Sequence, residues 1–271
     1  MAVLDFFKKK TNAAKYVRRS LISDDSHFSV IEAYKKTRTN FLFMLGNEKK
    51  VVAFASTIAN EGKTTNCLNL AISFAKVGKK VVVIDIDMRK PQVHNYLNVP
   101  IAPGLSDLLG KFVSDIPISK TQYENLDVIS AGTLPPAPPE LLMTHEFSEL
   151  LDTLREKYDY VFIDTPPVHL VTDLAVIAEK IDGVVFVVRE KTVPVTVLRK
   201  SIESVEAVGG KVLGFILNDS ERSTAFSKYS YRRRYADKYG YGYGYGYSSK
   251  ELEDQKKVFA EKEKAKAKEK K

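Results

Sequence analysis

The chain has 271 residues, 44% hydrophobic and 28% charged, which is enough for one sizeable α/β core with extensions. Its net charge of +8 lies at the ends: residues 1–22 carry +5 and residues 222–271 carry +8, which leaves −5 between them. A nucleic-acid-binding face is usually built into the folded domain, so this distribution disfavours a nucleic-acid partner. No apolar run reaches the roughly 20 residues that span a bilayer, and a single cysteine excludes an internal disulfide. We therefore expect a cytoplasmic protein that associates with a membrane only peripherally.

Residues 1–28 form the first predicted segment, in which apolar side chains alternate irregularly with Lys and Arg. Such a basic amphipathic pattern suits an anionic membrane surface or an acidic groove, and a solvated helix is an equal alternative. A helical stripe follows from Ser29 to Leu45. Glu32, Lys35 and Arg38 are spaced three apart on it, so they lie near one face and can form charge pairs across a subunit boundary.

The chain is organised around the loop 56–65, which joins an apolar run (Val51–Ala55) to a segment with helical spacing from Asn66 onward. Gly62, Lys63 and Thr64 match the second half of a P-loop, in which backbone amides hold phosphate oxygens. The lysine adds a charge at the β- and γ-phosphates, and the threonine hydroxyl can ligate Mg²⁺. The candidate ATP-binding residues of the loop are Asn60, Glu61, Gly62, Lys63, Thr64 and Thr65.

The start of this loop departs from the usual pattern, because Thr57 stands where a glycine is expected. Asn60 is a partial substitute, since asparagine tolerates the left-handed backbone region better than most other residues.

Two further apolar runs end in carboxylates. The first run begins at Val81 and carries Asp85 and Asp87 at its end, where strand alternation would place both on one side. The second run, residues 160–163, ends in Asp164 and is followed by prolines that stop the strand. Because open α/β sheets bind ligands at the carboxyl ends of their strands, these carboxylates should lie beside the P-loop. There they can organise Mg²⁺ and accept a proton from an attacking hydroxyl.

The remaining pattern completes a doubly wound α/β fold with a mostly parallel sheet. Strands are predicted at 126–130, 184–188 and 212–217, and one helix from about Glu140 to Lys157. Asn218 ends the last strand, where its amide could contact an adenine edge or cap the next turn.

From residue 222 the composition changes to a flexible basic tail. Eight of the chain's fourteen tyrosines fall in nineteen positions, with glycines between the later ones. These eight tail tyrosines are Tyr229, Tyr231, Tyr235, Tyr239, Tyr241, Tyr243, Tyr245 and Tyr247. Alternating glycine cannot build a packed face, so the strip offers its phenol groups to whatever can reach them, unless it is a linker without chemistry.

With these features the chain resembles the bacterial tyrosine kinases (BY-kinases), cytosolic autokinases that work with capsule and exopolysaccharide polymerisation systems. The resemblance covers roughly residues 29–247 and rests on the P-loop, a Walker A′ stretch (Val83–Arg89), a Walker B stretch (Phe162–Pro167) and the eight tail tyrosines. The first three features also occur in related deviant P-loop ATPases, so the tyrosines make the kinase interpretation specific. The family's Glu-x-x-Arg-x-x-Arg oligomerisation motif has a lysine at Lys35, which keeps the charge but loses the bidentate fork.

The resemblance implies a P-loop kinase domain over residues 29–221 and a tyrosine-rich tail over 222–271, with ATP and Mg²⁺ as cofactors. It implies that Lys63, Asp85 and Asp87 are catalytic, that Thr64, Asp87 and Asp164 hold the metal, and that the tail tyrosines accept phosphate. Which of Asp85 and Asp87 takes the proton stays open. The implied partners are further copies of the chain, in an oligomer that could be a ring, a transmembrane activator and a cognate tyrosine phosphatase, at the inner face of the membrane.

Two alternatives remain at the level of sequence. A ParA/MinD-like ATPase switch shares the P-loop fold, although that family places a signature lysine near the loop start, where Ser56 and Thr57 stand here. A nucleotide-responsive scaffold could use the tyrosine strip only to bind partners.

Overall fold

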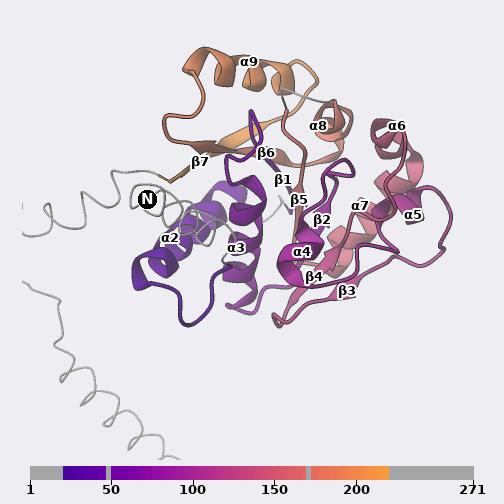
Figure 1. The fold of residues 1–271 in the computed structure, drawn as a ribbon, viewed down its shortest axis with the longest axis horizontal. Coiled ribbons are helices and arrows are strands. Elements are labelled where there is room, and N and C mark those ends of the chain that lie inside the picture. The colour runs from indigo at the N-terminus through magenta and orange to yellow at the C-terminus, as the bar shows by residue number, and fades with distance from the viewer. Residues whose placement is uncertain (1–20, 47–49, 169–171, 220–271) are drawn as a thin grey trace, which may run out of the picture. The chain divides into compact units, whose positions relative to one another are not determined.

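In the computed structural model, which describes residues 21–46, 50–168 and 172–219, seven strands of the described chain form one sheet in the order β3-β4-β2-β5-β1-β6-β7 (Figure 1). The strands are β1 (Val51–Ala55), β2 (Val81–Asp85), β3 (Ser119–Lys120), β4 (Leu126–Ile129), β5 (Tyr160–Asp164), β6 (Gly183–Arg189) and β7 (Val212–Asn218). All neighbouring pairs are parallel except β3 with β4, which is antiparallel. The predicted mostly parallel sheet is confirmed.

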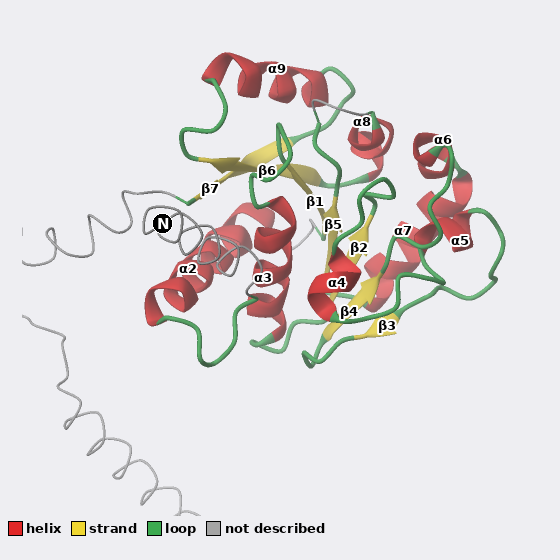
Figure 2. Cartoon of the chain, viewed as in Figure 1, coloured by secondary structure: helices red, strands yellow, loops and turns green. Residues whose placement is uncertain are grey.

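Helices cover both faces of the sheet, as a doubly wound fold requires (Figure 2). They are α2 (Phe28–Leu45), α3 (Lys63–Ala75), α4 (Val93–Leu97), α5 (Leu105–Leu109), α6 (Pro138–Met143), α7 (His145–Lys157), α8 (Asp173–Ile177), the 3₁₀ turn η1 (Ala178–Lys180) and α9 (Val195–Glu206). The first three pack on one face, and α5 to α9 pack on the other.

The core on the α2 and α3 side is built around aromatic rings. Phe54 of β1 and Phe162 of β5 project to this face, while their neighbours Ala53 and Ile163 project to the other. The two rings lie 5.2 Å apart between centroids in an edge-on arrangement, and Phe74 of α3 lies 5.5 Å from Phe162. This packing fixes α3, and with it the P-loop, against the central strands.

Some sequence predictions about element boundaries are wrong. The helix predicted from Glu140 to Lys157 is two helices, because Thr144 between them has an extended backbone (φ −63°, ψ 161°). Helix α3 begins at Lys63 rather than Asn66, and β2 ends at Asp85, before Asp87. The short elements β3, α4, α5 and α8 have five residues or fewer, too few for a periodic pattern to indicate them.

Several predicted features lie outside the described residues, namely most of the basic segment 1–28, the eight tail tyrosines and the rest of the tail. Within the described part of the chain, no helix is both long and apolar enough to cross a membrane.

The start of β1 is held in register by Asp182, which precedes β6. Its Oδ2 accepts hydrogen bonds from the backbone amides of Lys50 (2.7 Å) and Val51 (2.8 Å). Arg155 donates to both carboxylate oxygens at 2.9 and 2.7 Å. One carboxylate therefore joins α7, β1 and the turn before β6.

We expect Asp182→Ala to lower the free energy of unfolding by about 2–4 kcal/mol, because it leaves two backbone amides and a partly buried arginine without their acceptor. Urea denaturation measures this loss. Asp159→Ala is the matched control, since Asp159 accepts a single backbone bond, from Lys80 N at 2.8 Å, and should cost about 1 kcal/mol. Equal losses in the two variants would contradict the role given to Asp182.

Candidate functional site

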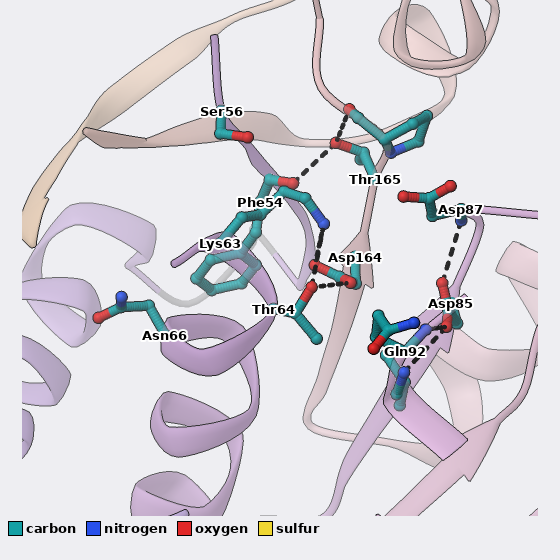
Figure 3. Close-up of polar contacts among 12 residues, drawn as sticks. Phe54, Ser56, Lys63, Thr64, Asn66, Asp85, Asp87, Gln92, Asp164 and Thr165 are labelled. Atoms are coloured by element: carbon teal, nitrogen blue, oxygen red, sulfur yellow. Dashed lines mark hydrogen bonds and ion pairs between the residues drawn. The ribbon is translucent and has the colours of Figure 1, made fainter. Parts of the chain in front are cut away.

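The candidate site lies where β1, β2 and β5 end side by side in the middle of the sheet (Figure 3). In the strand register Asp164 of β5 is opposite Asp85 of β2 on one side and Phe54 of β1 on the other. The loop that follows β1 therefore begins next to both carboxylates. Sequence reasoning predicted this meeting of three strand ends, and it is confirmed.

The P-loop takes left-handed backbone conformations at two residues, Asn60 (φ 68°) and Gly62 (φ 89°). The expected left-handed position of Asn60 is thus confirmed. Thr57, at the usual glycine position, has no positive φ and is fully buried, and its hydroxyl has no hydrogen-bond partner among the described residues. The loop therefore needs no glycine there.

Lys63 is the first residue of α3, and its ammonium group points at the end of β5 (Figure 3). Nζ donates to Asp164 Oδ1 at 2.5 Å, and the Thr64 hydroxyl donates to Asp164 Oδ2 at 2.7 Å. Lys63 is 7% exposed and Asp164 1%. Burial alone would lower the pKa of Lys63, but the carboxylate of Asp164 raises it above its ordinary value, so the lysine stays charged.

Asp85 is fully buried and forms hydrogen bonds with the segment that follows β2. Its carboxylate accepts hydrogen bonds from the amides of Asp87 (3.0 Å), Gln92 (3.2 Å) and Val93 (3.1 Å). Burial raises the pKa of Asp85 to about 8, Asp164 adds to the shift, and Lys63 opposes it. Burial therefore favours the protonated form of Asp85, and the hydrogen bond from the Val93 amide opposes it.

Asp87 lies beyond the end of β2 and is partly exposed. Its Oδ1 accepts the amide of Lys90 at 2.9 Å. β2 ends at Asp85, but Ile84, Ile86 and Met88 still all pack into the core on the α5 to α9 side, as alternation through Asp87 would require. That Asp85 and Asp87 lie on one side stays a prediction. The two aspartates have different surroundings: Asp85 is enclosed by backbone amides, and Asp87 is partly exposed to solvent.

Sequence reasoning missed a buried carboxylate next to this segment. Asp173, the first residue of α8, is fully buried, and neither of its oxygens has a hydrogen-bond partner within the described part of the chain. Arg89 Nη2 lies 3.8 Å from its Oδ2. Burial raises the pKa of Asp173, and Arg89 opposes that shift. No pattern marked this residue, because α8 is too short to be predicted.

Two asparagines of α3 were also missed. Asn66 donates to the carbonyl of Gly62 at 2.9 Å and accepts from the Tyr34 hydroxyl of α2 at 3.2 Å. Asn69 donates to the same hydroxyl at 3.1 Å. The available signal was the presence of two polar side chains on a helix that is almost wholly buried, because buried polar groups need hydrogen-bond partners.

The other candidate ATP-binding residues lie in or beside the loop, and their side chains form hydrogen bonds to other parts of the protein. Glu61 is fully buried, and its carboxylate accepts from the amides of Ile58 (3.0 Å) and Arg189 (3.3 Å). Asn218 Nδ2 donates to the carbonyl of Glu61 at 2.9 Å. The Thr65 hydroxyl lies 3.2 Å from the hydroxyl of Tyr96 in α4.

The predicted interface residues of α2 do not act as one group here. Lys35 and Glu32 form an exposed pair at 2.8 Å within the helix. Arg38 instead donates to the carbonyl (2.7 Å) and hydroxyl (3.0 Å) of Ser73 in α3. Their role between subunits stays a prediction.

The residues fit a nucleotide with Mg²⁺. The loop ends at the first turn of a 13-residue helix, with a buried lysine at its start, and this arrangement favours phosphate. The described residues contain no cluster of three or more His, Cys, Asp or Glu that could hold a metal by itself. Mg²⁺ typically needs only one or two carboxylates together with phosphate oxygens and waters, and Thr64, Asp164 and Asp87 supply such oxygens.

Comparison with known proteins agrees with this geometry. The AAA domain family matches residues 49–211. The putative tyrosine-protein kinase CapB of Staphylococcus aureus is 34% identical over 226 residues, which are 83% of this chain and 97% of that protein. Tyrosine-protein kinase YwqD of Bacillus subtilis is 35% identical over 202 residues, which are 74% of this chain and 85% of that protein.

Solved structures give the same result. The kinase domain of the Escherichia coli tyrosine kinase ETK superposes with a TM-score of 0.68 at 29% identity, over 80% of each chain. The cell-division ATPase MinD of Pyrococcus furiosus, at 24% identity and a TM-score of 0.56, shares the fold alone. With a P-loop, two aspartate-bearing strand ends and kinases as its relatives over most of its length, the chain belongs to the bacterial tyrosine kinases, the BY-kinase family.

Proposed function

We propose that this tyrosine kinase is an autokinase that uses ATP and Mg²⁺ to phosphorylate its own tail tyrosines, in trans within a homo-oligomer. The observation that carries the proposal is the meeting of Lys63, Thr64, Asp85 and Asp164 at the ends of three adjacent strands. Phosphoryl transfer needs positioning and charge neutralisation more than covalent chemistry, and this site offers both. The eight tail tyrosines, which fall within nineteen consecutive positions, are the proposed acceptors.

The bound nucleotide and metal would supply the transferable phosphoryl group and its charge compensation. Backbone amides of residues 60–65 would hold the phosphates, and Lys63 would move its ammonium group from Asp164 toward them. Thr64, Asp87 and Asp164 would hold the metal through their oxygens. Glu61 would contribute through its backbone, because its carboxylate is turned into the protein.

The acceptor tyrosine must lose its proton, and its hydroxyl, with an ordinary pKa near 10, is neutral at pH 7. Of the two aspartates, Asp87 is the one a tyrosine can reach from solvent. Asp85 is enclosed, and it bonds three amides of the segment that carries Asp87. We therefore propose that Asp87 accepts the proton of the tyrosine and that Asp85 positions the segment that carries Asp87.

The wider setting follows the family. We propose that the oligomer uses the face of α2 with Glu32, Lys35 and Arg38, and that the kinase regulates capsule or exopolysaccharide synthesis. A transmembrane activator would hold it at the inner face of the membrane, and a cognate tyrosine phosphatase would reverse the reaction. Phosphorylation would then act through charge: eight phosphotyrosines add about −12 to −16 to a tail of +8.

Phosphotyrosine formed on the purified protein with Mg-ATP is the first measurement. Lys63→Met should reduce it at least about 100-fold, because the phosphates lose their buried cation. Changing the eight tail tyrosines to Phe should abolish it while ATP binding is retained. Lys200→Met, on the exposed part of α9, is the matched control and should leave the signal unchanged. A signal that survives in the tail variant would place the acceptor elsewhere.

Asp85→Asn should flatten the pH dependence of stability in the nucleotide-free protein. The pKa of Asp85 is 3.8 ordinarily and about 8 in the folded chain. Since the folded state binds the proton more tightly, this contribution is fully present below about pH 4 and is lost as the pH rises through about 8. Urea denaturation between about pH 5 and about pH 8 should show a steeper fall in the parent than in the variant. Parallel curves would mean that Asp85 is ionised throughout.

Phosphorylation should loosen the oligomer, because a basic tail attracted to acidic neighbouring cores becomes acidic. In sedimentation at low salt, the phosphorylated protein should therefore show smaller species than the unphosphorylated protein, and added salt should reduce the difference. Equal sedimentation of the two forms at low salt would rule this out.

A further inference from the structure

The carboxyl ends of β6 and β7 form hydrogen bonds with the P-loop and hold it in place. Glu61 is the residue that both strands hold: Arg189, the last residue of β6, donates its amide to the carboxylate at 3.3 Å. Asn218, the last residue of β7, donates its side-chain amide to the carbonyl at 2.9 Å. Within the loop the same carboxylate also accepts from Ile58.

The side chain of Asn218 lies directly on Gly62. A Cβ atom built on this glycine would be 2.2 Å from Asn218 Nδ2 and 3.2 Å from its Cγ. A side chain at position 62 would therefore require Asn218 to move off the loop, and the φ of 89° is strained for any residue other than glycine. The side-chain amide of Asn218 therefore occupies the space that a side chain at position 62 would fill.

Asn218 and Arg189 are themselves held at the end of the described chain. The carbonyl of Asn218 accepts the amide of Glu190 at 3.2 Å. Arg189 donates through Nε and Nη2 to the carboxylate of Asp219 at 3.0 and 2.5 Å. Arg189 thus bonds the P-loop with its backbone and the first residue after β7 with its side chain.

We propose that Asn218 is a positioning residue that fixes the P-loop through Glu61 and Gly62, and that it does not select the adenine base. Nδ2 is already used on the loop, and the contact with Gly62 holds the amide plane against the backbone. The effect on phosphates then passes through the loop and is independent of the base. A link to the tail through Arg189 and Asp219 rests on the proposed autokinase function, whereas the positioning of the loop by Asn218 does not.

Binding of three ligands by the full-length chain separates positioning from base selection. The variants are Asn218→Asp, which keeps the shape but loses the donor, and Asn218→Leu, which loses all polarity. Mg²⁺ complexes of ATP, GTP and inorganic tripolyphosphate are titrated into each. We expect all three to weaken by about three- to tenfold, with the ratio of ATP to GTP affinity unchanged. Asn40→Asp, the same change on the exposed face of α2, should have no effect.

Amide hydrogen exchange gives a second readout that needs no activity. The amides of Ile58 and Arg189 should exchange faster in the Asn218 variants, while those of the central strands β1 and β5 keep their rates. Retained rates in the central strands show that the sheet is folded. Unchanged exchange at Ile58 and Arg189, or unchanged binding of all three ligands, would overturn the proposal.

A third test uses the unaltered protein, so it does not depend on how a variant folds. In its NMR spectrum the side-chain amide signals of Asn218 should shift when tripolyphosphate alone binds. Shifts that occur only with base-bearing nucleotides, or loss of ATP affinity with tripolyphosphate unaffected, would show that Asn218 contacts the base. None of these measurements uses phosphotyrosine, so failure of the autokinase proposal would be seen separately.

Discussion

The buried ion pair between Lys63 and Asp164 is the interaction on which the candidate site depends. Removing both charges from water is costly, and the cost is offset only because the pair is short and the Thr64 hydroxyl satisfies the second oxygen. That geometry requires β1 and β5 in register and α3 packed on the aromatic core beneath them. Since breaking such a pair leaves a buried charge, Lys63 can leave Asp164 only when other ions take the places of both partners. Phosphate and Mg²⁺ would be such replacements, so that Lys63 and Asp164 would exchange partners and neither would be left unpaired.

The charge balance of the site favours binding of a cation. Asp85 and Asp164 are opposite one another on adjacent strands, and Lys63 is the cation that both carboxylates face. Burial, and after it the charge of Asp164, raises the pKa of Asp85 and so favours its protonated form. A divalent ion would reverse that preference, because it stabilises ionised carboxylates nearby. The state of Asp85, and through its three amide bonds the placement of Asp87, would then be coupled to metal binding.

The sequence was sufficient for the parts of this molecule that depend on local pattern. Apolar runs predicted the central strands, and the rule that parallel strands end at one edge predicted that Lys63, Asp85 and Asp164 would meet there. What failed depends on distant contacts. Neither the buried Asp173 beside Arg89 nor the partner of Asn218, which is 157 residues away in the chain, leaves a periodic signal. The end of β2 at Asp85 was missed for a related reason: its carboxylate captures the amides of residues 87, 92 and 93, and this turns the chain away from the sheet.

The parallel topology also bears on how the tail reaches a site. β1 and β7 run in the same direction, so Asp219 follows β7 at the edge of the sheet where the P-loop follows β1. Tyr229 is ten residues beyond Asp219, and ten extended residues span at most about 36 Å. Chain length therefore does not prevent a tail tyrosine from reaching the site of its own subunit.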